Sequence, residues 1–264
     1  MKKFKQIFPV KKPIIGMIHL LPLPGYKDHP GMGLVISHAL KDLKALEKGG
    51  IDGVMVENEY DHPHQVTVGP EIISAMTKVV SEAVKKASVP VGLEVLLNDP
   101  KASLAIAKIT GAKYIRTDYF VDKMAREEYG GEMFTDPRGL MEYRKRIGAE
   151  NVVVLTDLQV KYATLMEKGK TISQSTSQAI EAGSGAVIIT GNRSGQPPKI
   201  SDLKEAKLTG ENFPVIIGSG FSFKNAENLL QWADGAIVGE SVKIGRNVNL
   251  RKVKQLMKVV GKVR

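Results

Sequence analysis

Ionisable side chains stand at the ends of several short apolar runs in this sequence. His19, Glu57 and Asp157 each close such a run, and Asp118 directly follows another. If the runs are parallel strands of one barrel, their carboxyl ends meet on the face where barrel enzymes build active sites. The sequence therefore predicts that these four side chains converge on one mouth, with Lys161 slightly beyond the fifth run.

Glu94 differs from the other acidic residues because it lies inside an apolar run, VGLEVL. Burying an unpaired carboxylate costs several kcal/mol. Glu94 is therefore expected either to form an ion pair inside the barrel or to take part in the site. Arg116, on the next run along the chain, is a candidate partner in both cases.

Two chemistries fit several carboxylates around one mouth. One is general acid–base catalysis on a sugar-like substrate, with different environments separating the pKa values of Glu57, Glu94 and Asp157. The other is binding of Mg²⁺, for which the same three carboxylates are the candidate ligands. His19 is expected either to orient the substrate or to bond a backbone carbonyl, and Lys161 is either a Schiff-base candidate or an exposed lysine. The candidate catalytic residues are His19, Glu57, Glu94, Asp118, Asp157 and Lys161.

Glycine-rich turns follow the last three apolar runs, and one of them, at 191–195, also carries a cation. Glycines let the backbone approach an oxyanion, and the N-termini of helices present unpaired amides; helices are expected to begin at Ser222 and just after Gly239. In barrels, the loops after the last two strands frequently bind phosphate. Glu240 is close to the expected anion, so it either points away or marks a ligand that is neutral there. The residues expected to bind phosphate are Gly191, Arg193, Gly195, Gly218, Ser219, Gly220, Gly239 and Ser241.

These residues are positioned by a repeated unit, in which a short apolar run is followed by an amphipathic helical pattern. Continuous apolar runs are typical of parallel strands buried on both faces. The expected strands are 13–19, 51–57, 89–96, 113–117, 151–157, 185–190, 213–218 and 234–239. The expected helices are 33–47, 70–86, 101–109, 137–147, 173–182, 201–208, 222–230 and 250–260. This alternation predicts an α/β fold, a single (β/α)8 TIM barrel over residues 1–264 rather than an open doubly wound sheet.

The segment 119–136 interrupts the repeat because it is too long for a plain connection between a strand and a helix. It is expected to form a lid or an extra hairpin, with Gly130 and Gly131 in the turn.

Composition narrows the possible classes of protein. The 264 residues include no cysteine, which excludes disulfides, thiolate metal sites, iron–sulfur clusters and a cysteine nucleophile. No run of about 18 uncharged apolar residues is present, and the N-terminus lacks a signal-peptide pattern, so we expect a cytoplasmic protein. The net charge of +10 comes from dispersed lysines. This favours a solvated surface or attraction of a phosphorylated small molecule over nucleic acid or a membrane surface.

Several segments resemble one known family. The segment 16–25 (GMIHLLPLPG) resembles the opening signature of the BtpA family, also called the BtpA/SgcQ family. Further similar segments are 53–58 (GVMVEN), 98–100 (NDP), 114–116 (YIR), 190–198 (TGNRSGQPP), 218–220 (GSG) and 233–243 (ADGAIVGESVK). The resemblance implies a TIM barrel of the ribulose-phosphate-binding type. The family is named after a factor needed for photosystem I accumulation in cyanobacteria, although its members also occur outside photosynthesis.

The chain departs from the family pattern around the expected mouth. Glu94 and Asp118 stand where asparagine is common, Leu97 where arginine is common, and Tyr162 where histidine is common. These changes make the mouth more negative, so the resemblance does not imply the substrate of the photosynthetic members.

The sequence favours an enzyme that acts on a phosphorylated sugar or nucleoside-like compound by acid–base or Mg²⁺-assisted chemistry. The alternative is a non-catalytic assembly or biogenesis factor, like a photosystem I assembly protein, acting through protein or membrane contacts. Barrels of this size commonly self-associate, so a homo-oligomer is expected.

Overall fold

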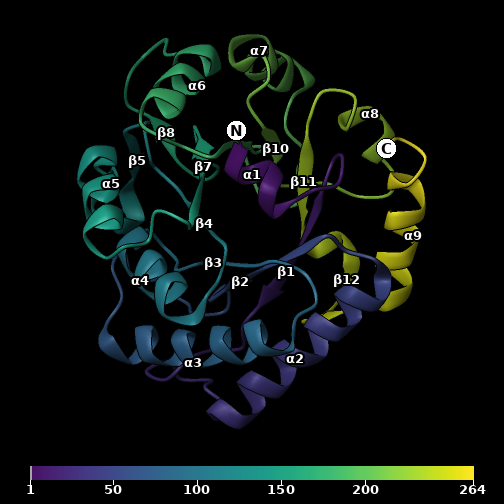
Figure 1. Cartoon of the computed structure of the whole chain (residues 1–264). Coiled ribbons are helices and arrows are strands. Elements are labelled where there is room, and N and C mark those ends of the chain that lie inside the picture. Colours follow the sequence, from purple (N-terminus) through teal and green to yellow (C-terminus); the bar gives the residue numbers. More distant parts are fainter. Residues whose placement is uncertain (1) are drawn as a thin grey trace.

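Eight parallel strands form a closed barrel in the computed structural model, which describes residues 2–264 (Figure 1). Around the barrel the strand order is β1-β11-β10-β9-β7-β4-β3-β2. The strands are β1 (Ile14–His19), β2 (Gly53–Glu57), β3 (Val91–Glu94), β4 (Tyr114–Thr117), β7 (Val153–Leu158), β9 (Ala186–Ile189), β10 (Val215–Ile217) and β11 (Gly235–Val238). The predicted TIM barrel is confirmed, and each strand lies within or overlaps its expected run.

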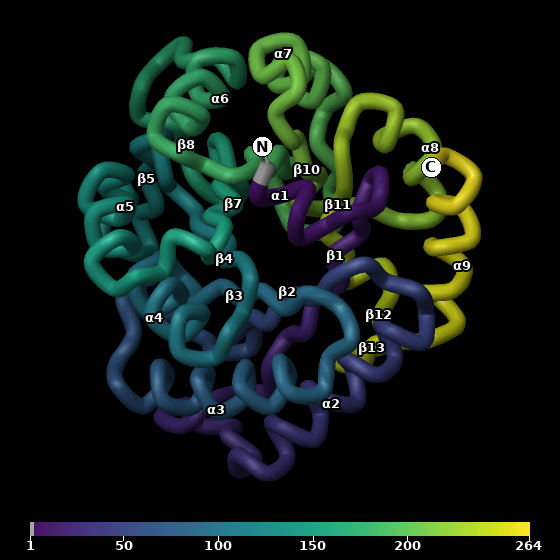
Figure 2. The backbone as a smooth tube through the Cα atoms, in the orientation of Figure 1, coloured from purple at the N-terminus to yellow at the C-terminus, as the bar shows by residue number. Residues whose placement is uncertain are grey.

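Helices surround the barrel and cover the outer faces of the strands (Figure 2). They are α2 (Met32–Gly49), α3 (Pro70–Lys86), α4 (Pro100–Thr110), α5 (Pro137–Arg146), α6 (Ile172–Glu181), α7 (Ile200–Gly210), α8 (Ala226–Leu229) and α9 (Leu250–Val260). Local signals fix several of their starts: the Asp99 carboxylate accepts from the amide of Ala102, and Thr171 forms a capping box with Gln174. Within residues 2–264, none of the helices combines the length and apolar character needed to cross a bilayer.

The helix expected to begin at Ser222 was predicted wrongly, because α8 begins at Ala226. The side-chain oxygen of Asn225 accepts a hydrogen bond from the amide of Ser222 at 2.9 Å, and the amide of Asn225 donates back to the Ser222 carbonyl. These two bonds hold residues 222–225 in a turn. The loop after β10 therefore presents a turn rather than the start of a long helix.

A short helix that the sequence analysis did not predict closes the amino-terminal end of the barrel. This helix, α1 (Lys2–Ile7), lies across the centre of the ring in Figure 1. The rings of Phe4 and Phe8 pack at a tilt, with their centroids 5.0 Å apart, and the ring centroids of Phe8 and Tyr114 are 5.4 Å apart. Together they join the apolar cluster inside the barrel, which includes Met55, Leu155 and Ile188.

The long connection after β4 contains a hairpin at the carboxyl end of the barrel. β5 (Met124–Arg126) pairs antiparallel with β6 (Gly131–Met133), and the 3-10 helix η1 (Glu127–Tyr129) joins them. β8 (Thr164–Leu165), from the loop after β7, adds a third strand. Gly130 and Gly131 both have positive φ angles, 90° and 97°. A second hairpin, β12 (Lys243–Ile244) with β13 (Asn247–Val248), follows β11.

Close packing inside the barrel makes Gly92 on β3 sensitive to substitution. A Cβ atom on Gly92 would lie 2.2 Å from the ring of Tyr114, whose hydroxyl donates to the Val54 carbonyl at 2.6 Å. We expect Gly92→Ala to lower the free energy of unfolding by about 1–3 kcal/mol, because the buried ring must move. Gly33→Ala, where nothing lies within 4 Å, is the matched control and should leave stability unchanged or slightly increased. Equal urea midpoints for the two variants would contradict this packing.

Candidate active site

Four ionisable side chains form a layer across neighbouring strands at the carboxyl end of the barrel. His19 on β1 is in register with Glu57 on β2, which is in register with Glu94 on β3. The Nε atom of Arg116 on β4 lies 3.5 Å from Glu94 Oε2. All four residues are at most 6% exposed. We call His19, Glu57, Glu94 and Arg116 the polar layer; strand register brings its members together because in-register residues of parallel strands point to the same face.

Arg116 is the buried cation of the polar layer. Its Nε donates to Asp157 Oδ2 at 2.7 Å and its Nη2 to Asp157 Oδ1 at 2.8 Å, a two-pronged pairing across β4 and β7. Burial by itself would lower the pKa of the guanidinium, but Asp157 and Glu94 raise it well above its usual range. Arg116 is therefore the ion-pair partner that was expected for Glu94, because Glu94 lies within an apolar run.

The two glutamates of the polar layer have pKa values shifted in opposite directions. Burial raises the pKa of Glu94 well above its usual range; Arg116 partly opposes this shift, and Asp118 and Glu57 add to it. For Glu57 burial acts in the same direction, yet contact with His19 and the charge of Arg116 leave its pKa below the usual range. The pKa of Glu94 therefore lies above that of Glu57, although the two carboxyl groups are in register on neighbouring strands.

His19 joins the polar layer to the cavity above it. Its Nε2 lies 3.4 Å from Glu57 Oε2, and its Nδ1 lies 3.6 Å from Glu240 Oε1. Burial lowers the pKa of His19 to about 3, despite the opposing charge of Glu57. The imidazole is therefore neutral at neutral pH. Its Nδ1 has no hydrogen-bond partner among the described residues.

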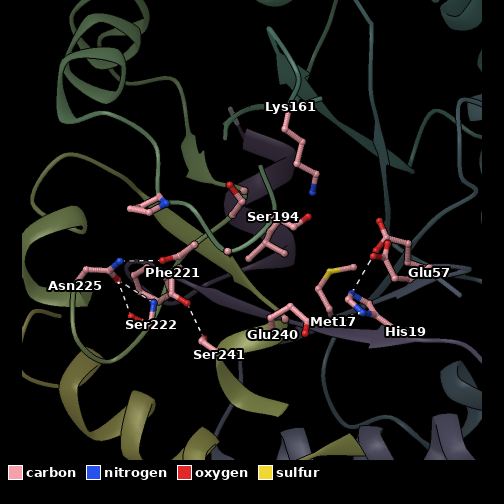
Figure 3. A pocket seen from close by; sticks show the side chains of 18 of the residues that line it. Met17, His19, Glu57, Lys161, Ser194, Phe221, Ser222, Asn225, Glu240 and Ser241 are labelled. Atoms are coloured by element: carbon pink, nitrogen blue, oxygen red, sulfur yellow. Dashed lines mark hydrogen bonds and ion pairs between the residues drawn. The ribbon is translucent and has the colours of Figure 1, made fainter. Parts of the chain in front are cut away.

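A cavity of about 710 Å³ opens above the polar layer. The loops after β10 and β11 line it together, because these strands are neighbours with Ile217 opposite Ala236. Figure 3 shows Ser222, Asn225 and Ser241 at one end, with His19 and Glu57 at the other. Of the predicted site residues, His19, Glu57, Lys161, Gly195, Gly218, Ser219, Gly220, Gly239 and Ser241 line the cavity.

The remaining predicted residues do not line the cavity. Glu94, Asp118 and Asp157 lie around Arg116, and of this group only Arg116 is part of the cavity wall in the described chain. Arg193 is exposed away from the cavity. Gly191 packs against the far side of its own loop, where a Cβ would lie 2.4 Å from the Gln196 carbonyl oxygen.

Serine hydroxyl groups form hydrogen bonds that link the three glycine-rich loops after β9, β10 and β11. Ser219 Oγ accepts from the amide of Gly191 and donates to the Gln196 carbonyl, both at 2.9 Å. Ser241 Oγ donates to the Phe221 carbonyl at 2.7 Å. Gly220, with φ of 63°, is held so closely that a Cβ would lie 2.1 Å from the nitrogen of Pro197. The hydroxyl protons of Ser219 and Ser241 are therefore used in hydrogen bonds between the loops.

At the end of the cavity formed by the loops after β10 and β11, backbone amides and one lysine are available to bind an anion. Within residues 2–264, the amides of Gly220, Phe221 and Ser241 donate to no protein acceptor. Lys224 lines the same end and is exposed. Sequence reasoning missed Lys224, although its place two residues after Ser222 could have identified it.

Glu59 is a second cavity residue that was not among the candidate catalytic residues. It follows β2 by two residues and lines the cavity near Glu57. Burial and the charge of Glu57 raise the pKa of Glu59 to about 7. A carboxyl group with this pKa exchanges its proton readily at neutral pH, which suits it to acid–base chemistry.

The residues expected to bind Mg²⁺ do not fit that role. Both carboxylate oxygens of Asp157 already accept hydrogen bonds from Arg116. The same guanidinium also lies beside Glu94, so a cation there would meet a fixed positive charge. Within residues 2–264, no group of three or more His, Asp or Glu side chains is arranged to hold a metal ion.

Asp118 provides a test of the buried charges under the cavity. Burial and the charge of Asp157 raise its pKa from 3.8 to about 7, so the folded state retains a proton that the unfolded chain loses between these values. The stability contribution of Asp118 therefore falls as pH rises through this window. We expect Asp118→Asn to increase the free energy of unfolding by about 1–4 kcal/mol at pH 8 and to change little at pH 3.5. Exposed Asp28→Asn is the control, and a gain for Asp118→Asn that is equal at both pH values would exclude this explanation.

The comparisons with known proteins agree with this barrel. The family model described as the BtpA family matches residues 10–262. The photosystem I biogenesis protein BtpA of Synechocystis sp. is 36% identical over 247 residues, covering 92% of this chain and 85% of that protein. The sgc region protein SgcQ of Escherichia coli is 30% identical over 271 residues and covers 100% of both chains.

Among solved structures, the (S)-3-O-geranylgeranylglyceryl phosphate synthase of Thermoplasma acidophilum, in complex with its substrate sn-glycerol-1-phosphate, has a TM-score of 0.64. It is 17% identical, and the match covers 99% of this chain and 98% of that one. This likeness concerns the fold alone. The family match and the identity of 30–36% to two of its relatives, over nearly the whole chain, show that the chain belongs to the BtpA family.

Proposed function

We propose that this chain is an enzyme acting on a phosphorylated small molecule, of the sugar or nucleoside-like class, by acid–base chemistry. The observation that carries the proposal is one cavity with two unlike ends. At one end the loops after β10 and β11 offer unpaired amides and Lys224. At the other end stand His19, Glu57 and Glu59.

The phosphate is bound by the backbone rather than by hydroxyl groups. Amides of Gly220, Phe221 and Ser241 donate to the phosphate oxygens, and Lys224 supplies positive charge. The bound sn-glycerol-1-phosphate in the structural neighbour supports this assignment, because that ligand also carries a phosphate ester. The three lysine and arginine residues of the cavity wall, Arg116, Lys161 and Lys224, attract the anion.

Proton transfer is assigned to Glu59, because its pKa of about 7 lets it both accept and return a proton at neutral pH. His19 is a positioning and hydrogen-bonding residue, since an imidazole with a pKa of about 3 is a weak base. The proton of its neutral ring is on Nε2, facing the Glu57 carboxylate, and Nδ1 is left as an acceptor for a substrate hydroxyl. Glu57 fixes this tautomer.

Lys224→Met tests the phosphate end. We expect the dissociation constant for glycerol phosphate, measured by calorimetry at low salt, to rise roughly tenfold, because one direct ion pair with the phosphate is lost. Lys254→Met on the exposed face of α9 removes the same charge far from the cavity and should leave affinity nearly unchanged. No saturable binding to the wild-type chain, or equal weakening in both variants, would refute the phosphate site.

Glu59→Gln tests the chemistry separately from binding. Phosphorylated sugars and nucleosides that raise the melting temperature are incubated with the chain, and product is followed by nuclear magnetic resonance. We expect turnover to fall about 10²-fold or more in Glu59→Gln, with less than a threefold change in the dissociation constant, because only the proton carrier is lost. Glu47→Gln, on the outer helix α2, is the control. Full turnover in the Glu59→Gln variant would assign proton transfer to another residue.

A further inference from the structure

A buried lysine behind the cavity wall is left without a hydrogen-bond acceptor. Lys243 is the first residue of β12, and its side chain is 1% exposed. Among the described residues, its Nζ has no hydrogen-bond partner. An ammonium group has three donors, and leaving them unsatisfied in a buried place is costly. The Lys243 ammonium can therefore take a further acceptor that comes within hydrogen-bond distance.

The charges around Lys243 explain why a cation is kept there. The buried carboxylate of Asp42 adds attraction to Lys243, and Asp42 Oδ1 accepts from the amide of Val248 at 2.9 Å. The ring of Tyr60 is 5.9 Å from the Lys243 Nζ atom. Asp42 provides a negative charge and the Tyr60 ring packs nearby, but neither group forms a hydrogen bond with the Lys243 ammonium.

Glu240 places a carboxylate oxygen between Lys243 and His19. Its Oε1 lies 3.7 Å from Lys243 Nζ and 3.6 Å from His19 Nδ1, both beyond hydrogen-bond distance. In Figure 3 Glu240 lies beside Met17, on the His19 side of Ser241. The Glu240 side chain is 60% exposed and lines the cavity, so it can rotate into solvent without breaking a hydrogen bond.

The hydrogen-bond partners that Lys243 and His19 lack are complementary. Lys243 Nζ is a donor without an acceptor, and His19 Nδ1, which is an acceptor in the tautomer proposed above, has no donor. A carboxylate with a neighbouring hydroxyl satisfies both, since the carboxylate accepts from Lys243 and the hydroxyl donates to His19. A phosphate ester alone satisfies neither at this place, because its phosphate binds at the other end of the cavity.

We propose that the place held by the Glu240 carboxylate is a second anion subsite, and that the substrate is a phosphorylated hydroxycarboxylic acid. The ligand carboxylate displaces that of Glu240 and pairs with Lys243, while the adjacent hydroxyl donates to His19 Nδ1. This inference rests on the proposed phosphate site and adds the substrate class. Glu240 thereby occupies the subsite when ligand is absent and leaves it when ligand binds.

Matched pairs of probes test the subsite. 6-Phosphogluconate and sorbitol 6-phosphate differ at the end of the chain, where one has a carboxylate and the other an alcohol; 3-phosphoglycerate and glycerol 3-phosphate form a shorter pair. We expect the wild-type chain to bind the carboxylate of at least one pair about tenfold more tightly. Glu240→Gln should increase this ratio about three- to tenfold, because the competing carboxylate is removed. Lys243→Met should reduce the ratio to about one.

Glu227→Gln is the matched control for Glu240→Gln, because Glu227 is also an exposed glutamate paired with a lysine, Lys262 at 3.8 Å. It should leave the ratio unchanged. Because Glu240 is mostly exposed, its variant tests the subsite even if Lys243→Met does not fold. Equal binding within both pairs, with the ratio unmoved in Glu240→Gln, would overturn the subsite and leave the phosphate site standing. Absence of binding by all four probes would overturn both proposals.

Discussion

The guanidinium of Arg116 is the charge on which the carboxyl end of this barrel depends. Strand register places Glu57 and Glu94 side by side, and Arg116 on β4 lies between Glu94 on β3 and Asp157 on β7. Several ionised carboxylates could not share this small volume without a buried cation. Arg116 donates two hydrogen bonds to Asp157 and partly opposes the rise that burial causes in the pKa of Glu94. The same arrangement keeps Glu57 ionised, and Glu57 in turn orients the ring of His19.

The two ends of the cavity are built by different means. At one end, loops packed against each other through Ser219 and Gly220 hold backbone amides in place. At the opposite end, His19 on β1, Glu57 on β2 and Glu59 just after β2 face the cavity, and their pKa values follow from burial and neighbouring charge. In the proposed function the rigid backbone site anchors one end of the ligand, and the side chains at the other end discriminate between substrates.

Much of the fold could be predicted from the sequence because parallel strands buried on both faces leave continuous apolar runs. The bounds of α3 and α9 were also predicted, since Pro70 and Asn249 mark their starts. Interactions between distant loops could not be predicted, since spacing does not show that the Ser219 hydroxyl bonds to another loop. The helix α1 was hidden by its basic composition, although Phe4 and Phe8 have the i, i+4 spacing of one helical face.

The position of α1 restricts the route by which a ligand can reach the cavity. Phe4 and Phe8 seal the amino-terminal end, and the apolar cluster fills the space below the polar layer. Any compound that binds in the cavity must therefore enter and leave at the carboxyl end of the barrel. A barrier raised at this single opening slows entry and exit by the same factor, because both cross one transition state. Changes to the opening can in this way alter how long a compound stays bound without altering its affinity.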